Sequence, residues 1–192
     1  MIEEYRRKTD EEVAEKVGEH PELIAILVQR YEVKLESYVR RISGLNYEDR
    51  QDLLQEIFIS VYENINSFDP DLRFNSWIYR ISHNKTINEW KKNKKKEGDI
   101  TIDENTKPFV DSLYNENNIE KDINQDISKE TLSKVLKNIK IEYREVLMLK
   151  FFDGHSYEEI SDIIQKPKNT VGTMVSRARK SFKKEFDKLN IK

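Results

Sequence analysis

The sequence predicts an all-α protein with two small helical domains joined by a flexible acidic linker. Apolar residues recur every three or four positions through most of the 192 residues, which is typical of helices that bury one face. Only 5 residues are Gly and 4 are Pro, too few for the many turns of an all-β fold. Between residues 98 and 128 the apolar period is lost and Asn, Asp and Glu predominate, which predicts the linker.

Two helices are expected at the start of the N-terminal domain. Thr9 followed by Glu12 is a capping-box pattern, which predicts that a short helix begins there. Pro21 suits the first turn of a second helix, and Gly44 ends it. The apolar positions of this second helix are Leu23, Ile24, Leu27, Tyr31, Leu35, Tyr38, Val39 and Ile42.

Two more helices complete this domain, which is expected to end near Lys96. Asn46 can cap the third helix, and a fourth begins at Asn75 or Ser76, after the break at 69–71. The apolar stripe of the third helix consists of Leu53, Ile57, Val61 and Ile65, widened by Leu54, Phe58 and Tyr62. The fourth helix carries Trp77, Ile78, Ile81, Ile87 and Trp90, and we expect Trp77 to be structural.

Helical spacing returns after the linker, in which a short helical piece is expected near residues 117–127. An apolar series over 132–150 predicts a helix that Gly154 closes. Ser156 and Glu159 form a second capping-box pattern. Residues 166–169 then predict a turn, and a last helix runs from Thr170 to about Leu189.

Composition excludes several kinds of chemistry. The absence of Cys excludes disulfides, thiolate zinc sites and cysteine nucleophiles. The three His are scattered, and neither a metal-ligand spacing nor a Gly-rich phosphate loop is found. We therefore expect no catalytic residue, metal or cofactor.

No apolar run approaches the roughly 18 residues that cross a bilayer, and the first residues are not a signal peptide. A cytoplasmic protein without membrane insertion is expected.

The net charge of −2 conceals two basic blocks separated by an acidic stretch. Residues 79–96 contain seven bases and one acid, and residues 166–192 contain nine bases and two acids. Residues 97–131 carry ten acids and three bases. Two separate contacts with a polyanion would explain this distribution, although charge runs of this kind are often only solvated helix faces.

The last two predicted helices and their turn have the pattern of a helix-turn-helix, whose second helix enters the major groove of DNA. The polar side of that helix is formed by Thr170, Thr173, Ser176, Arg177 and Lys180. Its packing side is formed by Val171, Met174, Val175 and Ala178. Because short basic helical hairpins that bind no DNA are common, the pattern alone leaves DNA contact open.

Two groups of motifs resemble bacterial sigma factors. Asp52 to Phe58, Phe68-Asp69 and Phe74 to Asn84 resemble the second conserved region of that family. Gly154 to Ile160, Pro167 to Val171 and Ser176 to Arg179 resemble the fourth region. The third region of larger sigma factors is missing, so the chain resembles the extracytoplasmic-function (ECF) type. The resemblance implies a region 2 domain at residues 1–97, an acidic linker at 98–129 and a region 4 domain at 130–192.

The resemblance implies core RNA polymerase and promoter DNA as partners. The polymerase contacts would be the β′ clamp coiled coil and the β flap. The acidic ridge on the third helix would meet the clamp, and its residues are Asp52, Gln55, Glu56 and Glu63. The alternative is that this ridge is only exposed to solvent, as most Asp, Glu and Gln side chains on helices are. Anti-sigma partners are common in the family, but no residue of this sequence marks such a contact.

The resemblance also implies that the fourth helix opens the −10 promoter element. A positive surface and a pocket for an unstacked base are needed for this step. We assign Phe68 as a pocket wall, and the DNA contacts to Arg80, Asn84, Lys85, Asn88, Lys91 and Lys92. His83 could lie near a phosphate, but a surface position without a role is the simpler expectation.

The predicted recognition helix departs from the family pattern. Gly172 and Met174 occupy positions that are commonly basic, and the turn has Gln165 and Asn169 where glycines are usual. Gly172 then allows close approach of DNA, or it is there by drift. The resemblance assigns reading of the −35 element to Lys168, Asn169, Thr170, Thr173, Ser176, Arg177 and Lys180.

Two other classes of protein are alternatives to a sigma factor. A helix-turn-helix regulator that is not a polymerase subunit would use only the C-terminal domain, and it leaves residues 52–96 unexplained. An enzyme such as a nuclease would need metal ligands or a phosphate loop, which the sequence does not contain.

Overall fold

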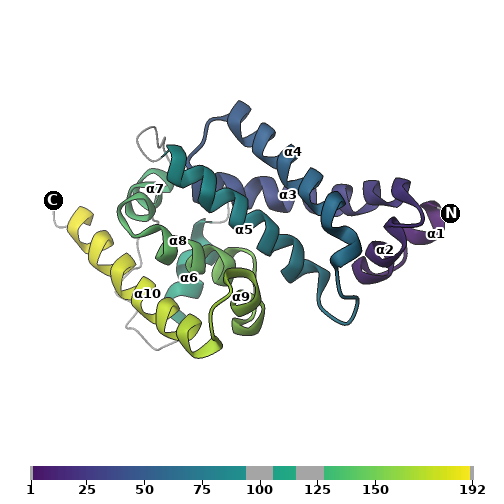
Figure 1. Cartoon of the computed structure of the whole chain (residues 1–192). Coiled ribbons are helices and arrows are strands. Elements are labelled where there is room, and N and C mark those ends of the chain that lie inside the picture. Colours follow the sequence, from purple (N-terminus) through teal and green to yellow (C-terminus); the bar gives the residue numbers. More distant parts are fainter. Residues whose placement is uncertain (1, 94–105, 116–127, 191–192) are drawn as a thin grey trace.

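The computed structural model describes residues 2–93, 106–115 and 128–190, and these ranges contain helices but no strands (Figure 1). The N-terminal domain comprises α1 (Ile2–Tyr5), α2 (Asp10–Val17), η1 (Pro21–Leu23), α3 (Ile24–Ser43), α4 (Tyr47–Asn64), η2 (Ile65–Ser67) and α5 (Phe74–Asn93). The C-terminal domain comprises α7 (Lys129–Asn138), α8 (Ile141–Leu147), the π-helical turn η4 (Met148–Phe152), α9 (Tyr157–Ile164) and α10 (Lys168–Asn190), with α6 (Thr106–Asn115) against it.

Local capping signals fix the ends of the N-terminal helices. Thr9 and Glu12 form the expected capping box at the start of α2. Gly44 ends α3 with φ 65, a left-handed conformation that glycine adopts at no steric cost. The Asn46 side chain accepts the N–H of Asp49 at the start of α4. α3 packs against α2, α4 and α5, so it lies at the centre of this domain.

The series over 132–150 is not one helix, as the sequence suggested, but two. Ile139 separates α7 from α8 with an extended backbone (φ −90, ψ 157), and its side chain is buried. No Gly or Pro marks this break. The break is therefore fixed by tertiary packing, which local sequence patterns do not reveal.

Part of the predicted flexible linker forms helix α6. Phe109, Val110 and Leu113 are buried, and the Phe109 ring stacks on Phe152 with centroids 4.3 Å apart. Arg179 of α10 donates a hydrogen bond to the carbonyl of Leu113. A ten-residue helix is marginal alone, so packing on the C-terminal domain stabilises it. The helical piece expected near 117–127 lies outside the described residues.

The two domains pack directly against each other, α5 against α9 and α3 against α8 and η4 (Figure 1). Buried polar contacts cross between them. The Tyr38 hydroxyl donates to Glu145 Oε1 at 2.6 Å, and Arg41 Nη2 lies 2.5 Å from Asp153 Oδ1. Arg144 Nη1 donates to the carbonyl of Ile42 at 2.8 Å. Because buried polar groups need specific partners, these contacts define one arrangement of the domains.

Candidate nucleic-acid interface

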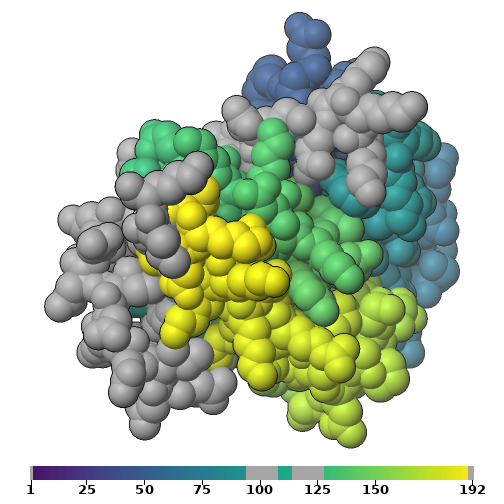
Figure 2. Space-filling view, turned by 90° about the vertical axis from the view of Figure 1, so that its left-hand side faces the viewer, coloured from purple at the N-terminus to yellow at the C-terminus, as the bar shows by residue number. Residues whose placement is uncertain are grey.

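The helix-turn-helix consists of α9 and α10. Ser156 and Glu159 form the expected capping box of α9, and Gln165 ends it in the left-handed region at φ 52. A turn follows, closed by the Thr170 N–H on the Pro167 carbonyl at 2.8 Å. The inner side of α10 is formed by Val171, Val175, Ala178 and Phe182, all buried. Its other side is therefore left to solvent, and α10 lies along the surface in Figure 2.

An open hollow of about 620 Å³ lies on the solvent side of the two helices. It is lined by Tyr157, Lys168, Asn169, Gly172, Thr173, Ser176, Arg177 and Lys180. Six of the seven residues that we predicted to read the −35 element are in this set. The seventh, Thr170, is exposed but does not line the hollow. The positions that the resemblance singles out thus form one surface.

Tyr157 is a lining residue that sequence reasoning missed. It opens α9, and the Lys150 ammonium lies over its ring, 5.0 Å from the centroid. Its position next to the Ser156 cap could have drawn attention to it.

Lys168 is paired with Glu158, and this hydrogen bond lowers the pKa of the Glu158 carboxyl. Both side chains are exposed, so a phosphate can compete for the ammonium.

Gly172 has no structural reason to be glycine. A Cβ added there would meet no atom within 4 Å, and the backbone is helical without a positive φ. Glycine inside a helix destabilises it by roughly 1 kcal/mol relative to alanine. Since nothing in the described fold requires the small residue, the hollow is simply open at this point.

α5 carries the residues assigned to the −10 element. Asn84, Asn88, Lys91 and Lys92 are exposed, whereas Arg80 and Lys85 are half-buried. Lys85 Nζ lies 3.6 Å from Glu56 Oε2 on α4, and Lys92 Nζ lies 3.1 Å from Glu89 Oε2. α5 thus presents amides and ammonium groups to solvent along part of its length.

Phe68 lies in the core of the N-terminal domain, at 7% exposure. Its ring contacts Phe74 and Trp77, with centroids 5.3 and 5.4 Å away. In this conformation its ring packs into the aromatic core, and its role as a pocket wall stays a prediction. Trp77 is also buried, as expected for a structural aromatic.

α4 exposes all four residues of the predicted acidic ridge: Asp52, Gln55, Glu56 and Glu63. Ile59 and Tyr62 are also exposed, at 56% and 46%, and they lie among these residues at helical spacing. The sequence placed Tyr62 in the core stripe, which is wrong. The α4 face therefore combines carboxylates with large apolar groups, a mixture that suits a protein partner.

His83, expected as a surface residue, lies between the domains instead. Its Nδ1 contacts the buried Glu145 carboxylate, which also accepts the Tyr38 hydroxyl. His155 contacts the ring of Tyr79 edge-on at 4.5 Å, and burial lowers its pKa. Burial raises the pKa of Asp153 to about 6, although the Arg41 guanidinium beside it acts in the opposite direction. Packing of the two domains thus places His83, His155 and Asp153 in poorly solvated positions.

Among the described helices, none combines the length and the apolar character needed to span a bilayer. Within the same ranges, no group of three or more His, Asp or Glu side chains is arranged to hold a metal ion.

The chain matches two family models, sigma-70 region 2 over residues 27–96 and sigma-70 region 4 over residues 129–182. It is 31% identical over 169 residues to the ECF RNA polymerase sigma factor SigW of Bacillus subtilis, covering 84% of this chain and 88% of that protein. It is 29% identical over 180 residues to the ECF RNA polymerase sigma-E factor of Escherichia coli K12, covering 91% and 92%.

Solved structures share the fold. One is CnrH in complex with the cytosolic domain of CnrY, with a TM-score of 0.68 at 21% identity, covering 93% of this chain and 97% of that chain. Another is the sigma factor RpoE of Bartonella quintana in complex with the anti-sigma factor NepR, with a TM-score of 0.60 at 17% identity, covering 84% and 94%.

Fold and sequence together define a sigma factor with a region 2 domain and a region 4 domain. The chain belongs to the ECF RNA polymerase sigma factors, which direct transcription initiation. The alternative of a regulator that acts outside the polymerase is not supported, since the region 2 match accounts for the N-terminal domain.

Proposed function

We propose that the hollow on α10 reads the −35 element, that α5 opens the −10 element, and that the exposed face of α4 docks on the β′ clamp of core RNA polymerase. The domains that carry these surfaces would be residues 1–97 and 130–192, with 98–129 between them. The chain would act as a polymerase subunit without enzymatic activity, in the cytoplasm where transcription takes place. The β flap would be a second polymerase contact, and an anti-sigma protein a further partner.

One observation carries the −35 assignment. Side chains chosen for the −35 element on sequence resemblance line one solvent-open hollow on the outer side of a helix-turn-helix. The hollow combines amide, hydroxyl and guanidinium groups, which are the groups that bond to base edges in the major groove. The relatives named above are polymerase sigma factors, which supports the promoter as the DNA target.

Comparing Arg177 with Lys183 tests this assignment. Both are exposed on α10, but only Arg177 lines the hollow. An Arg that forms two hydrogen bonds to guanine contributes about 1–3 kcal/mol of base discrimination, roughly ten-fold to a hundred-fold. Arg177→Ala should therefore weaken binding in a way that depends on sequence. Lys183→Ala should weaken all sequences alike and lower the salt slope by about one, as loss of a phosphate contact does.

The measurement is binding of holoenzyme, made from full-length chain and core polymerase, to promoters with single base changes in the −35 element at two salt concentrations. A uniform loss for Arg177→Ala would make it a phosphate contact, and base reading would pass to Asn169, Thr173 and Ser176. No loss for either variant would refute the assignment of α10.

A further inference from the structure

The first 26 residues lie outside the region 2 match, and the promoter contacts proposed above do not involve them. They include α2, whose Val13, Ala14 and Val17 are buried in the core of the N-terminal domain. α2 contacts α3, η2 and α5, so it touches the elements on both sides of the loop at residues 68–73. This loop leads into the helix that we assign to the −10 element.

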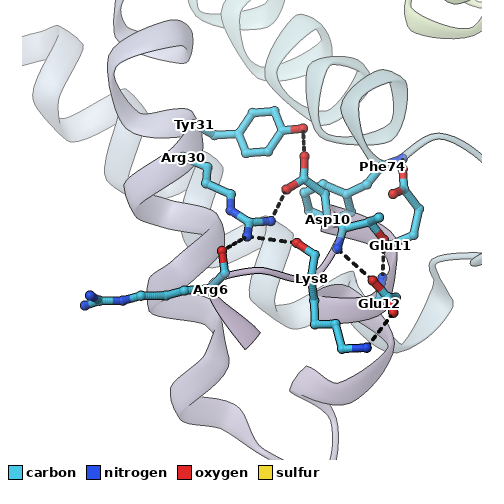
Figure 3. Close-up of polar contacts among 9 residues, drawn as sticks. Arg6, Lys8, Asp10, Glu11, Glu12, Arg30, Tyr31 and Phe74 are labelled. Atoms are coloured by element: carbon cyan, nitrogen blue, oxygen red, sulfur yellow. Dashed lines mark hydrogen bonds and ion pairs between the residues drawn. The ribbon is translucent and has the colours of Figure 1, made fainter. Parts of the chain in front are cut away.

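The start of α2 is fixed to α3 by a network of hydrogen bonds (Figure 3). Arg30 donates to Asp10 Oδ1 at 2.5 Å and to the carbonyls of Arg6 and Lys8 at 3.0 and 2.9 Å. The Tyr31 hydroxyl donates to the other Asp10 oxygen at 2.6 Å. Each carboxylate oxygen of Asp10 thus has a donor from α3, and the segment before α2 is held by its carbonyls. α2 is therefore a firmly positioned element.

Glu11, the next residue, reaches from α2 to α5. Its Oε1 accepts the backbone N–H of Phe74, the first residue of α5, at 2.9 Å (Figure 3). The first N–H groups of a helix have no partner within the helix, and a carboxylate there satisfies one and interacts favourably with the helix dipole. Glu11 thus caps a helix from 63 residues away in the sequence.

Gly18 brings the other end of α2 against the far end of the loop. A Cβ at this position would lie 2.4 Å from Oδ1 of Asn66, which belongs to η2. Real Cβ atoms do not approach other atoms this closely, so any larger residue would displace the Asn66 side chain. The end of α2 therefore packs against η2 through the exposed, rotatable side chain of Asn66.

Between these two anchor points the loop folds on itself. The N–H of Asp71 donates to Asp69 Oδ1, and the N–H of Leu72 donates to the Asp69 carbonyl, both at 3.0 Å. Leu72 is 54% exposed, so its side chain is available to a ligand. The elements at both ends of the loop contact α2, and Arg73 within the loop also donates to Glu159 Oε1 of α9 at 2.8 Å.

We propose that α2 positions the promoter-melting segment: Glu11 orients the first turn of α5, and the packing of α2 on η2 supports the other end of the loop. Loop 68–73 and the exposed amides of α5 are thereby placed for the unpaired −10 strand. This inference rests on the assignment of α5 to the −10 element. Glu11 is a positioning residue in this scheme, because it acts on DNA through α5 and does not touch it.

Promoter opening by full-length chain with core polymerase tests the proposal. The probes are a duplex promoter that the holoenzyme transcribes and the same promoter with a pre-opened, mismatched −10 segment. Glu11→Ala should slow opening of the duplex about ten-fold, the effect of losing one hydrogen bond to a charged group. The pre-opened promoter should restore the variant, and polymerase affinity should be unchanged. Glu11→Gln keeps an acceptor oxygen and should recover most of the rate.

Glu15→Ala is the matched control, because Glu15 is exposed on the same helix one turn later. It should open the duplex at the normal rate. Val17→Ala loosens the packing of the last turn of α2 on the core without touching Glu11, and it should repeat the Glu11→Ala defect from the other end. This variant keeps the proposal testable if loss of the cap prevents folding.

Three outcomes would overturn the inference. Normal duplex opening by both Glu11→Ala and Val17→Ala would exclude a positioning role. A defect that persists on the pre-opened promoter, or that extends to polymerase binding, would indicate general destabilisation instead. If Asn84→Ala also opens the duplex normally, the assignment of α5 fails and the inference fails with it. A defect for Asn84→Ala alone would refute only the role of α2.

Discussion

Arg41→Ala should separate the two domains of the free protein at neutral and alkaline pH. Arg41 lies on α3, whereas Asp153 follows η4, so their ion pair forms only when the domains are packed. Nη2 and Oδ1 are 2.5 Å apart, and the side chains are 6% and 8% exposed. The guanidinium also lies over the Phe152 ring, 4.8 Å from its centroid. The substitution leaves a buried carboxylate without this counter-ion.

The magnitude follows from the titration of Asp153. Burial raises its pKa from 3.8 to about 6 even beside Arg41, so keeping it ionised in the packed state costs about 3 kcal/mol at neutral pH. Removing one partner of a buried pair typically costs about 3–5 kcal/mol more. The ratio of packed to separated molecules should therefore fall by about a hundred-fold or more in Arg41→Ala.

The pH dependence has a definite sign. Because the pKa of Asp153 is raised in the packed state, its contribution to packing is complete below pH 3.8 and is lost as the pH rises through about 6. Without Arg41 this pKa rises further, so acidification should restore packing. The pKa of His155 is lowered by burial, so its protonation below about pH 6.5 opposes packing in all variants alike. A double variant, Arg41→Ala with Asp153→Asn, removes the carboxylate and should recover most of the packing at pH 8.

Energy transfer between two dyes measures the separation. The chain contains no Cys, so Cys introduced at Glu48 and Lys184, both exposed and on different domains, can be labelled selectively. Transfer should fall in Arg41→Ala at pH 8 and recover partly at pH 5.5. Equal transfer in Arg41→Ala and the parent at pH 8 would refute the reasoning. A loss that is the same at both pH values would show that the carboxylate is not its cause.

Three further predictions concern the proposed surfaces. Reversing charge at Asp52 and Glu56 should reduce core polymerase affinity about ten-fold or more. The melting temperature should hardly change, because both side chains are exposed. A matching loss of stability would show that this face is buried instead. Asn84→Ala should impair promoter opening more than closed-complex formation, and permanganate reactivity of the DNA measures the opening. If a promoter with a pre-melted −10 segment does not rescue the variant, the assignment of Asn84 is wrong. Gly172→Ala should raise the free energy of unfolding by about 1 kcal/mol and weaken binding to the −35 element. A more stable variant with unchanged affinity would show that DNA does not approach closely at position 172.

The sequence predicted those parts of the fold that local chemistry determines. The capping boxes at Thr9 and Ser156 and the Gly44 and Asn46 boundaries are where they were expected, because a cap forms between residues three or four apart. The break at Ile139 was missed, because it depends on packing with residues distant in the sequence.

Some surface residues were predicted correctly and others were not, because contacts between residues distant in the sequence leave no local pattern. The exposure of Asp52 and the lining of the hollow by Arg177 follow from helical periodicity. Tyr62 was placed in the core because an aromatic at helical spacing looks the same whether it faces the core or a partner. The contacts of His83 and Arg41 cross between domains, and nothing in the sequence marks which faces of two domains meet.

Docking of α6 has a consequence for how far apart the two domains can move. With α6 held on the C-terminal domain through Phe109, 12 residues lie between Asn93 and Thr106, and the fully extended chain between these two residues reaches at most about 45 Å. When α6 is released, 35 residues lie between Asn93 and Lys129, and the maximum reach between these two residues is about 125 Å. Docking of α6 through Phe109 would therefore limit the distance between the proposed −10 and −35 surfaces, and its release would widen the range of promoter spacings that the chain can span.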